Sequence, residues 1–189
     1  NSILIFHLII DPDQQQNGYG KKAKDVYEDT QGRIWVATFG DGLLKLEGQY
    51  LKKVEYNGRV SASHLLALCQ SDKQGLWLGT QGNGLLFYDF LTKTVRTKNE
   101  LIDNQSEIVR KVVQLGAELW VATEGNGMYI IDSLGQSKHL SQDTPTTISG
   151  KSVTEIFEDS QGNFWVGTAW NGVSVISGLN ATEEPFDQL

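Results

Sequence analysis

Four tryptophans recur along the chain at nearly equal intervals, and each opens the same short phrase. Successive members of the set lie 42, 43 and 45 residues apart, and each is followed by Val or Leu, a small residue and Thr. The four are Trp35, Trp77, Trp120 and Trp165. A period of about 40–45 residues is typical of propeller blades and other repeat arrays. The chain is therefore expected to fold as four copies of one unit.

Inside each unit, glycines separate two apolar runs. In the first unit, for example, Gly40–Gly42 stands between Trp35–Thr38 and Leu43–Leu46. Two such runs joined by Asp-Gly or Asn-Gly predict a β-hairpin, because these residues accept the positive φ of tight turns. The last glycine of each turn is Gly42, Gly84, Gly127 or Gly172. The small residue two positions after each Trp, where we expect close packing of the adjacent blade, is Ala37, Gly79, Ala122 or Gly167.

Two further runs complete the unit. An apolar run precedes each Trp and in three units leads into Asp-x-Gln-Gly, a turn sequence with Asp first and Gly fourth, while a more polar run follows the hairpin. Four short strands per unit describe a propeller blade. A helical repeat is the alternative, but Trp-Val-Ala-Thr followed by Gly-x-Gly would break a helix. We predict an all-β fold, a single β-propeller segment over residues 1–189. Its four four-stranded blades span residues 25–58, 65–98, 109–140 and 153–178.

The chain begins and ends out of phase with this repeat. The last unit lacks a fourth strand of its own, and the apolar run at residues 3–10 is available to supply it, which would close a small ring and hide the sheet edges. Alternatively, the chain is an arc of a larger propeller, whose open edges would pair with a second copy. The sequence leaves both alternatives open.

Charge and composition exclude several classes of partner. Hydrophobic residues make up 39% and charged residues 21%, which is a globular composition. The net charge is −7 and the basic residues occur only in small groups, so nucleic acid is not an expected partner. The apolar run at residues 3–10 is less than half of what a bilayer crossing needs. Membrane contact is expected only through parts of a parent chain outside this segment.

The reactive side chains form no catalytic or metal-binding motif. The single cysteine, Cys69, lies in an apolar run, and the three histidines are dispersed: His7, His64 and His139. The Glu-Asp pairs at 28–29 and 158–159 place consecutive carboxylates on opposite faces of a strand, so we assign the Asp to turn capping rather than to a catalytic dyad. We expect no catalytic residue, no metal site and no cofactor.

Two stretches carry a family resemblance. VYEDTQGRIWVATFGDGLLKL (Val26 to Leu46) and VTEIFEDSQGNFWVGTAWNGVSVI (Val153 to Ile176) resemble the two-component regulator propeller repeat. The resemblance covers about residues 25 to 178 and implies the periplasmic sensory region of a membrane-bound, often hybrid, histidine kinase of the Bacteroides type. In that family the sensor commonly detects oligosaccharides, and the full ectodomain carries more repeats, usually in seven-bladed propellers.

A ligand site is predicted where the repeat is broken. We expect the hairpin loop after the Thr of each Trp phrase to lie on the rim around the central channel, where propellers usually bind ligands. In the fourth unit, Trp170 stands in this loop in place of a glycine. A loop-tip aromatic can stack on a sugar ring while an amide and a carboxylate bind hydroxyls. The predicted ligand-binding residues are Phe39, Gln81, Glu124 and Trp170. The four repeat tryptophans are assigned instead to packing between blades.

The predicted function is ligand recognition without catalysis, in the periplasmic part of a two-component sensor. The expected partners are an oligosaccharide or other small ligand and a second copy bound through the propeller edges. Two alternatives remain. A propeller lyase or hydrolase would need a cluster of His or carboxylates at the channel mouth, and a pure scaffold would use its blades only for dimerisation.

Overall fold

Four β-sheets follow one another along the chain, each built from consecutive antiparallel strands. The computed structural model describes residues 9–10, 22–58, 60–72, 74–103, 108–144 and 148–177. The first blade holds β2 (Lys22–Glu28), β3 (Ile34–Phe39), β4 (Leu43–Glu47) and β5 (Tyr50–Lys53). The second holds β6 (Leu65–Ser71), β7 (Gly75–Thr80), β8 (Leu85–Asp89) and β9 (Thr94–Thr97). The third holds β10 (Val109–Leu115), β11 (Glu118–Thr123), β12 (Met128–Ile131) and β13 (Ser137–Leu140).

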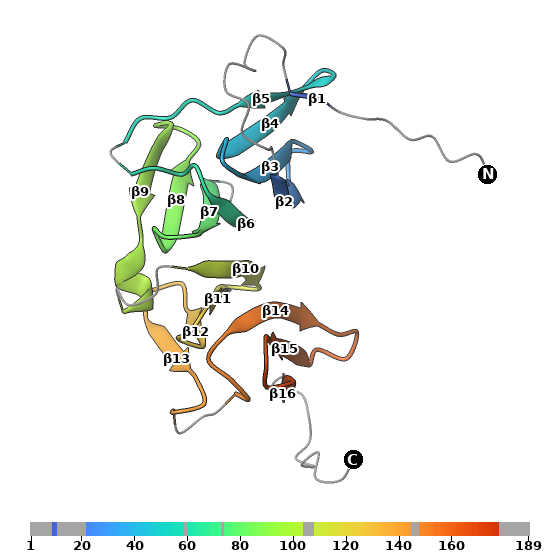
Figure 1. Cartoon of the computed structure of the whole chain (residues 1–189), viewed down its shortest axis with the longest axis vertical. Coiled ribbons are helices and arrows are strands. Elements are labelled where there is room, and N and C mark those ends of the chain that lie inside the picture. Colours follow the sequence, from blue (N-terminus) through green and yellow to red (C-terminus); the bar gives the residue numbers. More distant parts are fainter. Residues whose placement is uncertain are drawn as a thin grey trace, which may run out of the picture.

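The fourth sheet contains three strands within the described residues, namely β14 (Val153–Glu158), β15 (Phe164–Thr168) and β16 (Val173–Ile176). A 3-10 turn, η2 (Asn99–Ile102), connects the second blade to the third. Figure 1 shows the blades fanned along an arc, with the first strand of each blade on the concave side and β9 and β13 on the convex side. The predicted all-β propeller arrangement of four blades is confirmed.

Apolar cores fill the spaces between consecutive blades. Between the first two blades, Trp35 is 3% exposed, and its ring stacks on that of Phe90 at 5.5 Å between centroids. Between the third and fourth blades, Trp120 is 3% exposed and lies 4.5 Å from the ring of Phe164. Trp77 is half-buried, on the core between the second and third blades. The face that carries the repeat tryptophan therefore points toward the following blade.

Close approach of the blades explains the small residue two positions after each Trp. A Cβ built on Gly79 would lie 2.7 Å from the carbonyl oxygen of Val109, which belongs to the next blade. Ala37 and Ala122, at the same position of their own units, are fully buried. A larger side chain at this position would push the two sheets apart.

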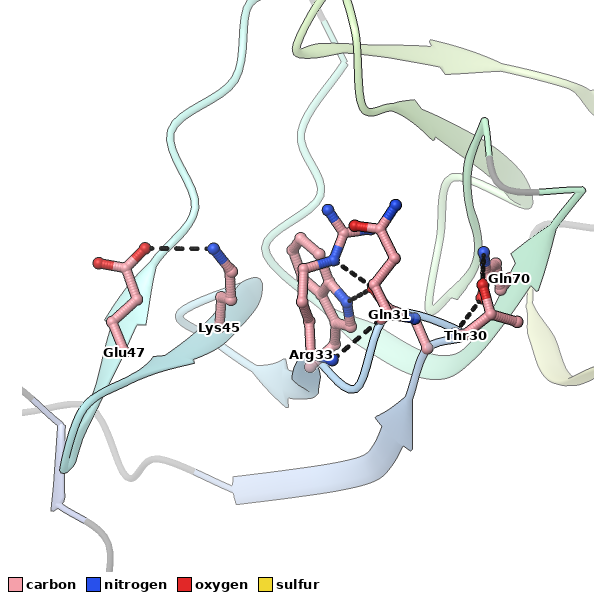
Figure 2. Close-up of polar contacts among 8 residues, drawn as sticks. Thr30, Gln31, Arg33, Lys45, Glu47 and Gln70 are labelled. Carbon is pink, nitrogen blue, oxygen red and sulfur yellow. Dashed lines mark hydrogen bonds and ion pairs between the residues drawn. The ribbon is translucent and has the colours of Figure 1, made fainter.

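A carboxylate organises the turn between β2 and β3, whose residues Thr30, Gln31 and Arg33 are labelled in Figure 2. One oxygen of Asp29 accepts hydrogen bonds from the backbone amides of Gln31 (2.9 Å) and Arg33 (3.0 Å). The other accepts from the Arg33 guanidinium and, at 2.8 Å, from the Trp35 indole. Burial raises the pKa of Asp29, but the bonds from Trp35 and Arg33 outweigh this and hold that pKa below its usual value.

The same device recurs with variations. In the fourth blade the Asp159 carboxylate accepts the Trp165 indole at 2.9 Å, while in the third the Trp120 indole donates to Glu118 at 3.0 Å. The turn of the first blade also contacts the second blade. Thr30 in the turn and Gln70 in β6 exchange two hydrogen bonds of 2.7 and 3.0 Å (Figure 2). The Asp-x-x-Gly turn thus fixes the orientation of the indole as well as the course of the chain.

On the fourth blade, the face that carries the repeat tryptophan is open. The register aligns Phe157, Trp165 and Val175 in one row across β14, β15 and β16. Their exposed fractions are 59%, 41% and 36%, and Val173 beside them is 59% exposed. We call this set the blade 4 face. Its residues are of the kind that form the buried cores between the other blades.

The N-terminal run pairs at the other end of the arc. Residues 3–10 are the predicted ring-closing strand, and residues 3–8 lie outside the described part of the chain. β1 (Ile9–Ile10) pairs in parallel with β5, at the opposite end of the arc from β16 (Figure 1). Ile9 and Ile10 therefore pair with the first blade, and ring closure by residues 3–10 stays one of the two alternatives that the sequence left open. The pairing with β5 forms because β5 is the outer strand of its sheet, whose unpaired backbone groups accept another strand.

In the described part of the chain, no helix is long and apolar enough to span a bilayer.

Candidate ligand-binding rim

The hairpins between the second and third strands of the blades have one shared shape. In each, the hydroxyl of the Thr that ends the Trp phrase donates to the carbonyl oxygen of the turn glycine four residues later, at 2.7–2.9 Å. The four donors are Thr38, Thr80, Thr123 and Thr168. The residues between Thr and Gly therefore occupy equivalent positions in every blade, and together these loops form one rim.

The hairpin of the first blade also rests on the connector into the second blade. The amides of Gly40 and Gly42 both donate to the carbonyl of Ser63, at 2.8 and 3.1 Å. Gly42 has φ +80°, and a Cβ there would lie 2.6 Å from the carbonyl oxygen of Ala62. Only glycine fits this combination of positive φ and close backbone. A Cβ on Gly172, its counterpart in the fourth blade, would meet nothing within 4 Å of the described residues.

The structure places the four predicted ligand-binding residues on this rim, one on each blade. The Phe39 ring contacts the His64 ring edge to face, with centroids 4.4 Å apart. Gln81 is exposed. Glu124 forms an ion pair with Arg110, and both side chains are 38% exposed. Trp170 is 89% exposed.

Backbone contacts join three of these positions in order along the rim. His64 bridges to Phe39, and its carbonyl accepts the amide of Gln81 at 2.9 Å. Ile108 in turn bridges to Gln81, and its carbonyl accepts the amide of Glu124 at 3.0 Å. An aromatic ring, an amide and a carboxylate therefore lie in sequence on neighbouring blades. Trp170 lies on the hairpin of the fourth blade, beyond the third.

Sequence reasoning missed the basic side chains of this rim. The first strand of every blade contains a bulge near its start, and the extra residue of the bulge is Lys24, Leu66, Arg110 or Thr154. A bulge redirects the side chain of its extra residue. Lys24 thereby lies over the Phe39 ring, 5.9 Å from its centroid, and Arg110 reaches Glu124. The sequence does not mark which residue of a strand is the extra one, because that depends on how the strand pairs with its neighbour.

Three hollows lie at the other end of the blades, where the second strand begins. They hold about 330, 500 and 570 Å³, and one lies at each junction between consecutive blades. The repeat residues Trp35, Trp77 and Trp120 line the first, second and third hollow respectively. The predicted ligand-binding residues do not line any of these three.

The reactive side chains of the described residues are dispersed. They include no group of three or more His, Cys, Asp or Glu that could hold a metal ion. Burial raises the pKa of the Cys69 thiol to about 11, so it remains protonated at neutral pH. His139 Nε2 lies 2.7 Å from the carbonyl oxygen of Asn126, and its ring stacks on Tyr129. The arrangement is suited to holding a ligand by stacking, hydrogen bonds and charge.

Two segments of the chain, residues 21–40 and 147–170, match the family model described as the two component regulator propeller. Each segment contains the bulge, the carboxylate turn and the Trp phrase of its blade, the first or the fourth. A comparison with curated proteins gave no match.

Solved propeller structures resemble the chain in fold. The extracellular domain of a proposed hybrid two component system from B. thetaiotaomicron, BT4673, superimposes with a TM-score of 0.68 at 18% identity, over 88% of this chain and 20% of that one. A second from the same organism, BT3049, gives 0.53 at 19%, over 90% and 28%. Virginiamycin B lyase from Staphylococcus aureus gives 0.56 at 13%, over 82% and 55%.

The chain spans less than a third of either B. thetaiotaomicron protein, and at these identities the likeness establishes the fold alone. The propeller is also the fold of an enzyme, as the lyase illustrates, so the fold does not decide between binding and catalysis. The resemblance of this chain to the two-component regulator propeller repeat is confirmed in its first and fourth blades.

Proposed function

We propose that this segment is a ligand-sensing part of the extracytoplasmic region of a two-component histidine kinase, and that its ligand is an oligosaccharide. The match of residues 21–40 and 147–170 to the two component regulator propeller model is the observation that carries this proposal. The parent chain supplies the kinase and the membrane anchor, and the segment lies in the periplasm. No bond is made or broken in this segment.

The rim supplies the three kinds of contact that sugars need. Trp170 offers an indole face to the apolar side of a sugar ring, since it is 89% exposed. The Gln81 amide donates to and accepts from hydroxyls, and the Glu124 carboxylate accepts from them. Arg110 holds Glu124 in place through their ion pair. Binding produces a signal only if the ligand prefers one of two arrangements of the ectodomain.

A thermal-shift screen of neutral oligosaccharides tests this proposal. A ligand at a hundred times its dissociation constant stabilises the fold by roughly 2.7 kcal/mol, which raises the melting temperature by several degrees. Trp170→Ala should leave the melting temperature of the free protein unchanged and remove the shift. Leu134→Ala is the matched control, because Leu134 is 81% exposed on the turn between β12 and β13, away from the rim.

The outcomes separate the alternatives. A shift that survives in Trp170→Ala would place the ligand elsewhere. Turnover of a glycan, lost in the same variant, would favour an enzyme of the lyase or hydrolase class. No shift with any glycan would leave the scaffold function, in which the blades only associate.

We further propose that another blade of the same repeat covers the blade 4 face. Each of the other repeat tryptophans faces a following blade, and Trp165 is 41% exposed where Trp35 and Trp120 are 3% exposed. For the 189-residue chain by itself, a second copy is the source of such a blade. Apolar rows of this kind associate when they are left uncovered.

Sedimentation equilibrium tests the association. The chain should show a concentration-dependent dimer, and Val175→Asp should give monomers, because it buries an unpaired carboxylate at the interface. Leu91→Asp is the control on an exposed turn, since Leu91 is 91% exposed. A chain that stays monomeric at high concentration would contradict the proposal for the isolated segment.

A further inference from the structure

The hollow between the first two blades collects positive charge in an acidic protein. Five of its eleven lining residues are Lys or Arg, against two glutamates, whereas the chain as a whole has 16 Lys and Arg and 23 Asp and Glu. The five are Arg33, Lys45, Lys52, Lys53 and Lys93. Charges of one sign in a concave site focus the field and raise the local concentration of the opposite ion.

The other two hollows provide an internal comparison, because the repeat builds all three in the same place. In the part of the chain that the structure describes, the second is lined by Asp72 and Asp132 and by no Lys or Arg. The third is lined by Lys138 together with Glu118 and Glu158. The positive charge is therefore a property of the first hollow and not of the blade junction as such.

Arg33 is held rigidly at the wall of the first hollow. Its Nε donates to Asp29, and its guanidinium carbon lies 4.2 Å from the Phe90 ring centroid and 5.3 Å from that of Trp35. Among the described residues, its buried Nη2 has no hydrogen-bond acceptor. A guanidinium fixed in this way keeps its positive charge at the wall of the hollow, where it attracts an anion such as a carboxylate or sulfate.

Two lysines beside it share one carboxylate. The Nζ atoms of Lys45 and Lys52 lie 3.4 and 3.8 Å from the two carboxylate oxygens of Glu47, so one carboxylate is shared by two ammonium groups. Figure 2 shows Lys45 and Glu47 on the strand facing Arg33. Lys93, on the turn that follows β8, adds a further charge to the lining, at a φ of +52°.

We propose that the first hollow binds an oxyanion, the carboxylate or sulfate group of a small ligand. The charges of Arg33, Lys45 and Lys93 attract the anionic oxygens, and the rings of Trp35 and Phe90 provide an apolar wall for the carbon skeleton. This site is separate from the hairpin rim, and its existence does not depend on what the rim binds.

NMR of the ¹⁵N-labelled chain tests the site, because the Trp35 indole N–H is bonded to the same carboxylate as Arg33. The titrants are sodium sulfate, sodium glucuronate and, as a neutral control, glucose, all at constant ionic strength. Either anion should shift the Trp35 indole signal saturably, and glucose should not. The Trp120 indole reports on the third hollow and should stay in place. The relative affinities of sulfate and glucuronate then distinguish an inorganic anion from an acidic sugar.

Variants make the result specific. Lys45→Met and Lys93→Met should each weaken binding roughly five- to ten-fold, as expected for loss of a charge-assisted contact at a partly exposed site. Lys138→Met makes the same change in the third hollow and should leave the affinity unaltered. Unperturbed amide spectra show that the variants are folded. A Trp35 signal that ignores both anions would overturn the proposal, and an affinity unchanged in both lysine variants would mean an adventitious ion only.

Discussion

The repeat offers a comparison between two tryptophans in the same local setting. Trp35 and Trp165 each follow a carboxylate turn, and each indole donates to the Asp six residues earlier, at 2.8 and 2.9 Å. Trp35 is 3% exposed against the next blade, and Trp165 is 41% exposed on the blade 4 face. Replacing either tryptophan by Ala therefore removes an equivalent hydrogen bond, but only Trp35→Ala also removes a buried contact with the next blade.

Trp35→Ala should reduce the free energy of unfolding by about 3–5 kcal/mol, the range for truncating a large buried aromatic. Trp165→Ala should reduce it by about 1–2 kcal/mol, because little more than half of its surface is covered and part of that burial is within its own sheet. The assay is urea unfolding at a protein concentration low enough to keep the chain monomeric, followed by both fluorescence and circular dichroism. Equal losses for the two variants would refute the idea that packing between blades holds this fold together.

Three further predictions follow from single positions. Gly79→Ala should destabilise the protein by about 1–3 kcal/mol through overpacking, because its Cβ would lie 2.7 Å from the carbonyl oxygen of Val109. Gly167→Ala should be neutral within about 1 kcal/mol, because its Cβ would lie 3.7 Å from the nearest atom, and thermal melts of the two variants check this difference. The pKa of Asp29 in the folded protein lies below its unfolded value of about 3.9, so the stability that its carboxylate contributes is present above that pH and is lost as the pH falls further. Asp29→Asn should therefore make stability, measured as the urea midpoint, depend less on pH in the acid range. An unchanged slope would contradict this. Cys69, with its pKa raised to about 11 by burial, should resist a thiol reagent at pH 8 until urea unfolds the chain, and rapid labelling of the native protein would count against its buried position.

The repeat made the blades predictable from sequence. Trp-Val-Ala-Thr and Asn-Gly or Asp-Gly report strictly local preferences, a β-strand and a tight turn, and four copies of them reinforce one another. Thr38 and Asp29 belong to the same repeated motif, but their roles depend on hydrogen bonds with residues four and six positions away, respectively. The pattern therefore indicated a turn and not the bonds that hold it.

The parts that escaped prediction depend on contacts between distant segments. The pairing of β1 with β5 rather than with the last blade joins residues about forty positions apart, and nothing in the apolar run at 3–10 specifies its partner. The positive hollow joins Arg33 and Lys45 of one blade with Lys93 of the next. These lysines have no shared sequence motif, and only the stacking of two blades brings them together.

The predicted rim lies between these cases. Its four positions could be selected from the sequence because the repeat breaks there, and the structure puts Phe39, Gln81 and Glu124 in order on neighbouring blades. Lys24 and Arg110 join them only because a bulge redirects each side chain, which is a feature of strand pairing.

The most direct measurement is an NMR titration of the ¹⁵N-labelled chain with an oligosaccharide that raises its melting temperature. The account predicts saturable shifts of the Trp170 indole and of the Gln81 and Glu124 amides, with the Trp35 indole unmoved. Shifts confined to the opposite end of the blades, or Trp170, Gln81 and Glu124 signals that stay in place at saturation, would contradict the claim that this rim is a glycan sensor.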